Sequence, residues 1–212
     1  MTGILDSVQI GRPRHLDQPE PWVTAFHKAP ISGRVHASST GLTGDGQADL
    51  TVHGGPDKAI CVYPGEHYAA WRREIALDAY GPGWFGENFT LRGLVEPDVA
   101  IGDVCRVGSA LLQVSQPRGP CSKLARRWNR PDMVRRVVES GRTGWYLRVL
   151  ESGDVGAGDE VDRIERAHPH LTVAAANRAM YGDASAPDVE ALVRELAACP
   201  ALSAAWRNNL RD

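Results

Sequence analysis

IGDVCRVGSALLQVSQPRGPC, residues 101–121, is the stretch of this sequence that decides the fold. It contains two short apolar runs with the pattern of β-strands, at residues 104–107 and 110–115. A Gly-Asp pair at 102–103 precedes the first run, as turn residues before a strand often do. After the second run, two prolines stiffen the chain up to Cys121. The stretch therefore predicts short consecutive strands followed by a stiff loop that presents one thiol.

Cys121 has an electrostatic setting that distinguishes it from the other cysteines. Arg118 lies three residues before it and Lys123 two residues after it. Positive charge near a thiol lowers its pKa and favours the thiolate, the form that attacks electrophiles and ligates soft metals. The alternative is a surface loop with an incidental thiol, against which stand the two prolines and the two cations. We therefore predict that Cys121 is the functional cysteine.

Many further short runs in residues 1–165 have the same strand pattern and are limited by glycine and proline. These runs are Gly3–Gly11, Trp22–Phe26, Val35–Ala37, Ala59–Tyr63, Phe89–Arg92, Gly144–Leu150 and Glu160–Ile164. Short strands at this spacing predict a closed or nearly closed β-barrel. We expect this mainly β domain to span residues 1–166 and a small three-helix module to span residues 167–212.

Helical spacing of apolar residues predicts two helices inside the barrel region and three after it. The first follows Pro64, and the second runs from about 131 to 140, where Gly141 ends it. The C-terminal helices are expected over 173–180 with Thr172 as cap, after a capping-box pattern that starts at Ser185, and over 202–210. Few of the module's residues are basic, so packing or partner binding suits it better than DNA binding.

Composition excludes several classes of protein. The chain has 212 residues, 42% of them hydrophobic, and a formal net charge of −2, so no global basic field attracts nucleic acid. Nothing at the N-terminus resembles a signal peptide, and no apolar run reaches the length of a membrane span. We therefore expect a cytoplasmic protein with no membrane and no nucleic-acid partner. The oligomeric state is left open, a homodimer included.

The four cysteines are far apart and form no CxxC pair, which argues against a disulfide framework and against a cysteine-rich zinc site. Cys61 and Cys105 lie in apolar strand-like runs and are expected to be small buried hydrophobes. Lysine is scarce: only Lys28, Lys58 and Lys123 occur among 24 basic residues. Two of these three lysines lie in the motif-like segments, which suggests positions that arginine does not fill.

GLTGDGQADLTVHGGPDKAICVYPGEHY, residues 41–68, is a second candidate segment. Gly54 and Gly55 permit backbone geometry that side chains forbid, and successive amides in such a turn can hold an anion. Lys58 adds positive charge, while His53 is as suited to a structural hydrogen bond as to chemistry. An ordinary glycine-rich turn with a solvated lysine is the alternative, and the segment alone does not separate the two.

GWFGENFTLRGL, residues 83–94, is the third candidate segment. Asn88 offers a donor and an acceptor, which suits recognition of a heterocycle's edge, although an Asx-type turn before a strand explains it equally simply. Ser115 and Gln116 are able to supply hydrogen bonds, but polar residues at a strand end usually face water. His67 is expected on a helix surface.

Together these segments resemble the MOSC family, named after the C-terminal domain of molybdenum cofactor sulfurases, and its YiiM-like branch in particular. The resemblance covers about residues 35–165, through residues 41–68, GENFTLRGL (86–94), residues 101–121, GRTGWYLRVL (141–150) and GDVGAGDEV (153–161). LTVAAANRAM, residues 171–180, is similar to the start of the three-helix module that follows the domain in that branch.

The resemblance implies a β-barrel-type fold that binds the molybdenum cofactor, a pterin dithiolene with a phosphate. The cysteine of the family's Pro-Cys motif, here Cys121, supplies a thiolate to the metal. Related enzymes reduce N-hydroxylated compounds such as hydroxylamines, amidoximes and N-hydroxylated base analogues, with electrons from a separate flavoprotein or haem partner. This chain has no ferredoxin-like cysteine cluster, so its electrons must come from elsewhere.

The residues agree with this implication. Arg118 can hold the cofactor's phosphate in a fork, and Lys58 and Lys123 act as point charges. Asn88 and the loop His53-Gly54-Gly55 are candidates for the pterin edge. We expect a molybdenum-dependent reductase of N-hydroxylated compounds. A non-catalytic carrier of the cofactor or of sulfur, using Cys121 as a transfer thiol, is the alternative, and an interaction module centred on the C-terminal helices is a third.

Overall fold

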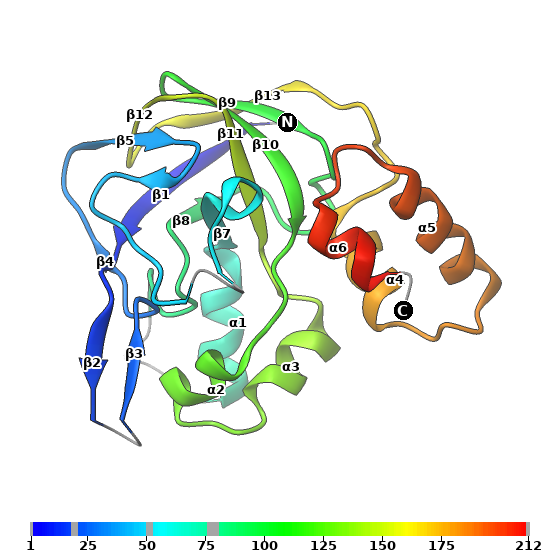
Figure 1. The fold of residues 1–212 in the computed structure, drawn as a ribbon, viewed down its shortest axis with the longest axis horizontal. Coiled ribbons are helices and arrows are strands. Elements are labelled where there is room, and N and C mark those ends of the chain that lie inside the picture. Colours follow the sequence, from blue (N-terminus) through cyan, green and yellow to red (C-terminus); the bar gives the residue numbers. More distant parts are fainter. Residues whose placement is uncertain (1, 18–20, 50–52, 76–80, 211–212) are drawn as a thin grey trace.

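Seven strands close into a β-barrel, which confirms the predicted fold class (Figure 1). The computed structural model describes residues 2–17, 21–49, 53–75 and 81–210. Around the barrel the order is β13 (Glu160–Glu165), β9 (Val104–Val107), β10 (Ala110–Pro117), β11 (Trp145–Glu151), β7 (Ile60–Pro64), β8 (Phe89–Arg92) and β1 (Thr2–Ile10), and β1 pairs with β13. β7 and β8 pair in parallel because the chain crosses between them through helix α1 (Glu66–Ile75).

Shorter strands complete the β-structure. β4 (Ala29–Pro30) pairs with β1, and β12 (Gly153–Gly156), β5 (Arg34–Ser38) and β6 (Gly41–Leu42) form a small sheet. β2 (Arg14–Leu16) and β3 (Trp22–Thr24) form a hairpin that extends away from the barrel (Figure 1). The segment 22–26 is therefore a strand, as predicted, but its β-structure ends at Thr24.

Successive side chains of β7 alternate between the interior of the barrel and its outer face. Ile60 and Val62 point into the barrel and join its core, which includes Leu112 and Trp145. Tyr63 points outward and joins a second apolar cluster. Every residue of β7 is buried, because helices cover the outer face of this strand.

That outer layer consists of α1, α2 (Ser122–Trp128) and α3 (Met133–Ser140), which lie below the barrel in Figure 1. The rings of Tyr63 and Phe85 stack at a centroid distance of 3.9 Å in the centre of the second cluster. α3 begins at Met133 and not at Pro131, and Gly141 ends it in the left-handed conformation (φ 68°), as predicted. None of the described helices has the length and apolar character that crossing a membrane requires.

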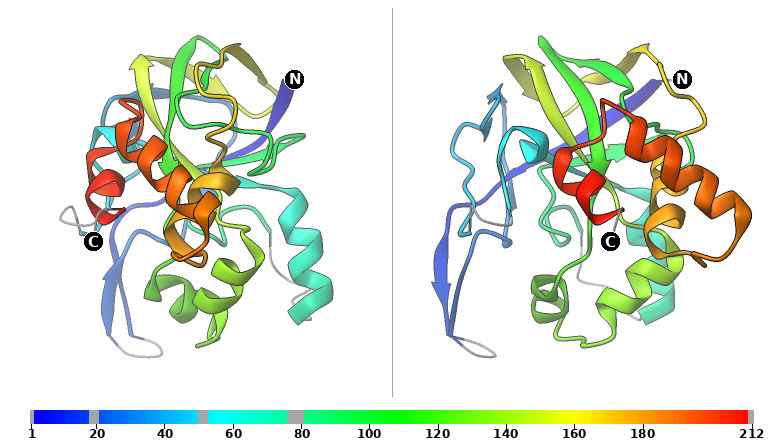
Figure 2. Two further views of the ribbon diagram at one scale, coloured as in Figure 1. Left: turned by 90° about the vertical axis from the view of Figure 1, so that its right-hand side faces the viewer. Right: turned by 45° about the vertical axis from the view of Figure 1, so that its right-hand side comes forward.

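The three C-terminal helices lie together beside the barrel (Figures 1 and 2). They are α4 (Val173–Tyr181), α5 (Pro187–Ala198) and α6 (Ala204–Asn209), and we call residues 171–210 the three-helix module. Thr172 caps α4 as predicted, with its Oγ1 accepting from the Ala175 amide at 3.0 Å. The prediction of a capping box at Ser185 is wrong. The Ser185 hydroxyl donates to Asp183 instead, and no side chain caps the N-terminus of α5.

The module shares one apolar core with the barrel. Residues of the module that belong to the barrel's cluster include Leu171, Val173, Leu196, Leu202 and Trp206. The module therefore packs directly against this side of the barrel through apolar side chains. The predicted domain boundary between residues 166 and 167 stays a prediction.

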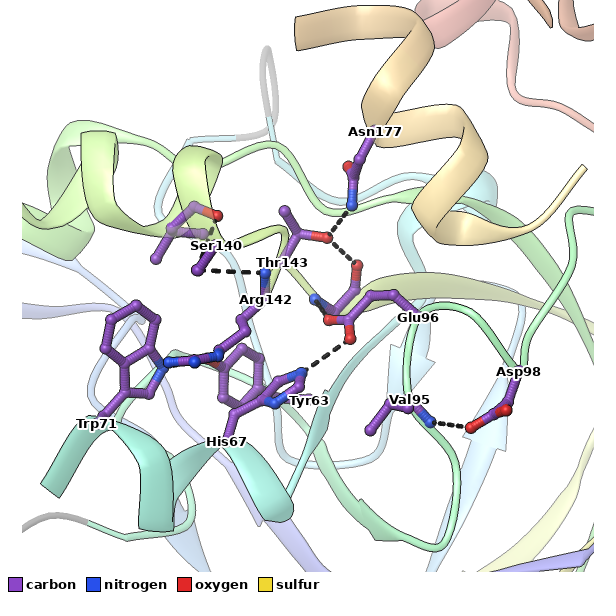
Figure 3. A network of polar contacts seen from close by, with 12 residues as sticks. Tyr63, His67, Trp71, Val95, Glu96, Asp98, Ser140, Arg142, Thr143 and Asn177 are labelled. Atoms are coloured by element: carbon purple, nitrogen blue, oxygen red, sulfur yellow. Dashed lines mark hydrogen bonds and ion pairs between the residues drawn. The ribbon is translucent and has the colours of Figure 1, made fainter. Parts of the chain in front are cut away.

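Two expectations about polar side chains were wrong. His67 is not on a helix surface: its side chain is 11% exposed and its Nε2 lies 2.8 Å from Glu96 Oε2 (Figure 3). Ser115 and Gln116 do not face water; both are buried, and the Ser115 hydroxyl donates to the Asp57 carbonyl at 2.5 Å. Sequence alone does not show these partners, because each is distant along the chain.

Candidate functional site

Cys121 lies where strand β10 gives way to helix α2. β10 ends at Pro117, and Cys121 is the N-cap residue of α2 with an extended backbone (φ −131°, ψ 167°). Its side chain is half-buried, whereas the other three cysteines are buried. The sequence did not predict α2, because seven residues are too few to show a helical period.

A pocket of about 620 Å³, counting its space open to solvent, lies beside Cys121. All predicted site residues except Gly55 line it, namely Cys121, His53, Gly54, Lys58, Asn88, Arg118 and Lys123. Gly55 instead caps a 3₁₀ turn, η1 (Pro56–Lys58), with a left-handed φ of 85°. The structure thus brings the three motifs to one pocket, and the roles of these residues stay predictions.

Part of the pocket wall is the outer face of the barrel. Cys61 on β7 and Tyr146 on β11 are register partners, and both line the pocket. Burial raises the pKa of the Cys61 thiol to about 11 and the pKa of the Tyr146 phenol well above its usual value. Both groups therefore stay protonated at neutral pH. The prediction that Cys61 is buried is confirmed, but its contact with the pocket was not predicted.

Arg118 brings a buried positive charge to the pocket. It is 3% exposed, its amide donates to the Gly144 carbonyl at 3.0 Å, and its Nη2 donates to the Phe85 carbonyl at 2.8 Å. Its Nη1 is buried and has no hydrogen-bond partner in the part of the chain that the structure describes. An uncompensated buried donor on a cation is costly, and an anion in the pocket would offset that cost.

His53 is neutral in this pocket at physiological pH. Burial, followed by the positive charges of Lys123 and Lys58, lowers the pKa of its imidazole to about 4. Lys58 comes from the same loop as His53, whereas Lys123 comes from the segment that carries Cys121, and all three line the pocket. A neutral imidazole offers one donor and one acceptor to a ligand and adds no charge.

All three lysines of the chain line the pocket, Lys28 as well as Lys58 and Lys123. Lys28 was not predicted as a site residue. Its Nζ lies 2.5 Å from Asp45 Oδ2, and both side chains are nearly fully buried. Lysine scarcity was the signal that pointed to Lys28, but no motif surrounded it.

The Asn88 side chain connects three separate segments of the chain through hydrogen bonds. Its Oδ1 accepts from the Cys61 amide at 3.1 Å, and its Nδ2 donates to the Gln9 carbonyl at 3.2 Å and to Asp45 Oδ2 at 2.9 Å. The donors expected to meet a heterocycle are therefore engaged inside the protein. Its neighbour Glu87 is fully buried and accepts from the Gly83 and Phe85 amides and from two side-chain hydroxyls.

The loop that carries His53 and Lys58 is fixed to the barrel. The Asp57 carbonyl accepts from Ser115 on β10, and its carboxylate Oδ1 accepts from Arg148 Nε on β11 at 3.0 Å. Lys58 is thereby held next to the end of β10, from which Arg118 and Cys121 follow. Within the described ranges no group of three or more His, Cys, Asp or Glu side chains is placed to hold a metal ion.

Comparison with known proteins gives matches over most of the chain. Residues 49–162 match the MOSC domain model, and residues 171–212 match the model of the YiiM-like 3-alpha helix domain. Uncharacterized protein YflK of Bacillus subtilis is 43% identical over 202 residues, covering 95% of this chain and 90% of YflK. A protein named reductase from Gibberella moniliformis is 36% identical over 174 residues, covering 81% of this chain and 31% of that protein.

A solved structure agrees with these matches. The crystal structure of YiiM from Geobacillus stearothermophilus superposes with a TM-score of 0.83 at 34% identity, covering 99% of this chain and 97% of that one. The fold, the C-terminal helices included, is therefore shared over nearly the full length of both chains. The chain belongs to the MOSC domain family and carries the YiiM-like 3-alpha helix domain at its C-terminal end.

Proposed function

We propose that this protein is a MOSC-type oxidoreductase that binds the molybdenum cofactor beside Cys121 and reduces N-hydroxylated compounds. One observation carries the proposal: the same pocket is lined by a half-buried thiol and by a buried arginine whose Nη1 has no hydrogen-bond partner among the described residues. A soft metal prefers a thiolate ligand, and a phosphate group binds to cationic side chains. Family membership and the relative named reductase support an oxidoreductase.

The residues present fit such a cofactor. Arg118, Lys58 and Lys123 would hold its phosphate, since a buried guanidinium and two ammonium groups are the usual partners of that anion. Cys121 would give the metal one thiolate, while the metal's remaining ligands come with the cofactor. When bound, the cofactor would supply the two-electron redox chemistry that amino-acid side chains lack.

The side chains of this pocket would then orient the cofactor and set the charge around it. His53 is neutral, so it would contribute a hydrogen bond without opposing the cations around it. Tyr146 and Cys61 remain protonated and keep negative charge away from Cys121. In the overall reaction, two electrons and two protons convert an N–OH group into N–H and water. The electrons would come from a separate flavoprotein or haem protein.

Turnover of the full-length holoprotein tests the proposal. With a chemical reductant and an excess of a hydroxylamine, we expect repeated formation of amine, lost in Cys121→Ser and retained in Cys199→Ala, whose thiol is buried in the three-helix module. Retained turnover in Cys121→Ser would contradict the assignment. Stoichiometric release of cofactor or sulfur without repeated turnover would instead favour the carrier.

A further inference from the structure

The three-helix module contacts the chain segment that leads into Cys121. Ser203, at the start of α6, donates its amide to the Ser115 carbonyl at 3.0 Å. Its hydroxyl donates to Gln116 Oε1 at 2.6 Å, and Gln116 Nε2 in turn donates to the Pro117 carbonyl at 3.2 Å. Ser203, Ser115 and Gln116 are all buried. One loop of the module therefore fixes the last residues of β10.

A second connection runs from α4 to Arg118, and Figure 3 shows the part of it between Asn177 and Thr143. Asn177 Nδ2 donates to Thr143 Oγ1 at 2.8 Å, and the Thr143 hydroxyl donates to the Gly144 carbonyl at 2.9 Å. That same carbonyl accepts from the Arg118 amide at 3.0 Å. Asn177 and Thr143 are 6% and 0% exposed, so water does not compete for these bonds. The module thus reaches the backbone of Arg118, a pocket residue, through three hydrogen bonds.

Gly144, at the centre of this connection, has contacts on two further sides. Its amide donates to Glu96 Oε1 at 2.7 Å, and the other oxygen of Glu96 binds His67 (Figure 3). A Cβ on Gly144 would lie 2.2 Å from the Val62 carbonyl, so the peptide sits directly against β7. Gly144 therefore joins the backbone of Arg118 to Thr143, the residue that α4 contacts.

The end of α4 also lies over the pocket segment. A Cβ on Gly119 would lie 3.7 Å from the Tyr181 hydroxyl, and Gly119 lines the pocket. Tyr181 is the last residue of α4. Contacts from the module therefore reach residues 115–119 at the strand end, at the Arg118 backbone and at the glycine before the Pro-Cys pair.

We propose that the three-helix module is part of the framework of the pocket, and that Ser203 and Asn177 are positioning residues for Arg118 and Cys121. Neither side chain touches the pocket; each acts through a buried hydrogen bond to the segment that does. The functional meaning of this positioning rests on the proposed function, whereas the positioning itself does not. The module is then a support for the site and not a separate binding unit.

A pair of matched variants tests the proposal on the full-length chain. Ser203→Ala and Thr172→Ala each remove the hydroxyl that caps a module helix, but only Ser203 also binds the pocket segment. We expect amide exchange of the peptide covering residues 113–124 to rise about fivefold in Ser203→Ala, since one buried hydrogen bond is lost there, and to stay unchanged in Thr172→Ala. Alkylation of Cys121, located by peptide mass spectrometry, should accelerate in the same variant only.

A second pair keeps the test decisive if Ser203→Ala does not fold. Thr143→Val removes the hydroxyl that connects Asn177 to Gly144, and Thr143→Ser keeps it. Faster exchange at residues 113–124 in the valine variant, with rescue by serine, is the expected result. The positioning role would be contradicted if amide exchange at residues 113–124 were equal in Ser203→Ala and Thr172→Ala and also equal in Thr143→Val and Thr143→Ser. These readouts need neither cofactor nor substrate, so they stand or fall separately from reductase activity.

Discussion

Arg118 sets the chemical character of the pocket, because its charge is buried and no carboxylate pairs with it among the described residues. The guanidinium also lies 5.7 Å from the centre of the Phe26 ring, which offers only weak compensation. A cation in this state destabilises the folded protein until an anion arrives. Anion binding and folding stability are therefore coupled at this residue.

Phosphate should stabilise the protein through Arg118. In saturating inorganic phosphate we expect the melting temperature to rise by roughly 2–4 °C in the wild type and to change little in Arg118→Met. Arg135→Met is the control, since that arginine is exposed and paired with Glu139. Differential scanning fluorimetry measures all three proteins; equal shifts in all of them would rule out an anion site at Arg118.

His53 should make stability depend on pH. Its pKa is about 4 in the folded protein and 6.5 in its ordinary state, so the fold disfavours the protonated form. The contribution is complete above pH 6.5 and is lost as the pH falls through 4. Urea unfolding should therefore show a steeper fall in stability from pH 6.5 to 4 for the wild type than for His53→Asn. Parallel curves would contradict the lowered pKa.

At the scale of single residues, the sequence predicted those site residues that lie close together along the chain. Cys121, Arg118 and Lys123 lie within six residues of one another, so their charges and the prolines between them are visible in one window. Tyr146 and Lys28 were missed because they reach the pocket only through strand pairing and loop packing. Asn88 was found, but its partners are 27 to 79 residues away, so its engaged amide was not predictable.

Gly144 connects the elements around the pocket. It precedes β11, has a left-handed φ of 71°, and leaves no room for a Cβ against the Val62 carbonyl. Strand β11, the Arg118 segment and the loop of Glu96 all meet at its peptide. The geometry at this point depends on glycine for two reasons, conformation and close approach.

Replacing this glycine should be far more costly than replacing a glycine that only caps a helix. We expect Gly144→Ala to lower the free energy of unfolding by more than about 3 kcal/mol, because strain and a backbone clash add. Gly141→Ala, with φ 68° and open space around its Cβ position, should cost only about 1 kcal/mol. Urea denaturation compares them; similar losses would contradict the close packing at Gly144.

Among the elements, strands were the most predictable. Phe89–Arg92 and Val104–Val107 begin and end as predicted, because alternation and turn residues mark both ends. β2, β4, β6 and β12 were missed, since none of these short segments (RHL, AP, GL and GDVG) contains a run of strand-forming apolar residues. The start of α5 was misjudged because Ser185 bonds to Asp183 within its own turn.

At the scale of the whole molecule, the barrel and the three-helix module share one apolar core. Apolar residues of both belong to a single buried cluster, and polar contacts such as Arg148 Nη2 to the Ala201 carbonyl (2.9 Å) connect them as well. A module that packs this way is not expected to unfold alone. The sequence predicted three helices after a barrel, but it held no information on how tightly they dock.

Unfolding should therefore occur in one transition. We expect far-UV circular dichroism and tryptophan fluorescence to give the same urea midpoint, because loss of the module exposes the barrel core. Trp206→Ala should lower that midpoint for both probes together, at a cost of about 3–5 kcal/mol. An intermediate with a folded barrel and an unfolded module would contradict this account.

The most direct test of the central claim is the molybdenum content of gently purified protein. Elemental analysis should find stoichiometric molybdenum in the wild type and in Cys199→Ala, and little in Cys121→Ser, because only Cys121 combines a half-buried thiol with the cationic pocket. Full molybdenum content in Cys121→Ser, or none in the wild type expressed with an adequate molybdate supply, would contradict the account.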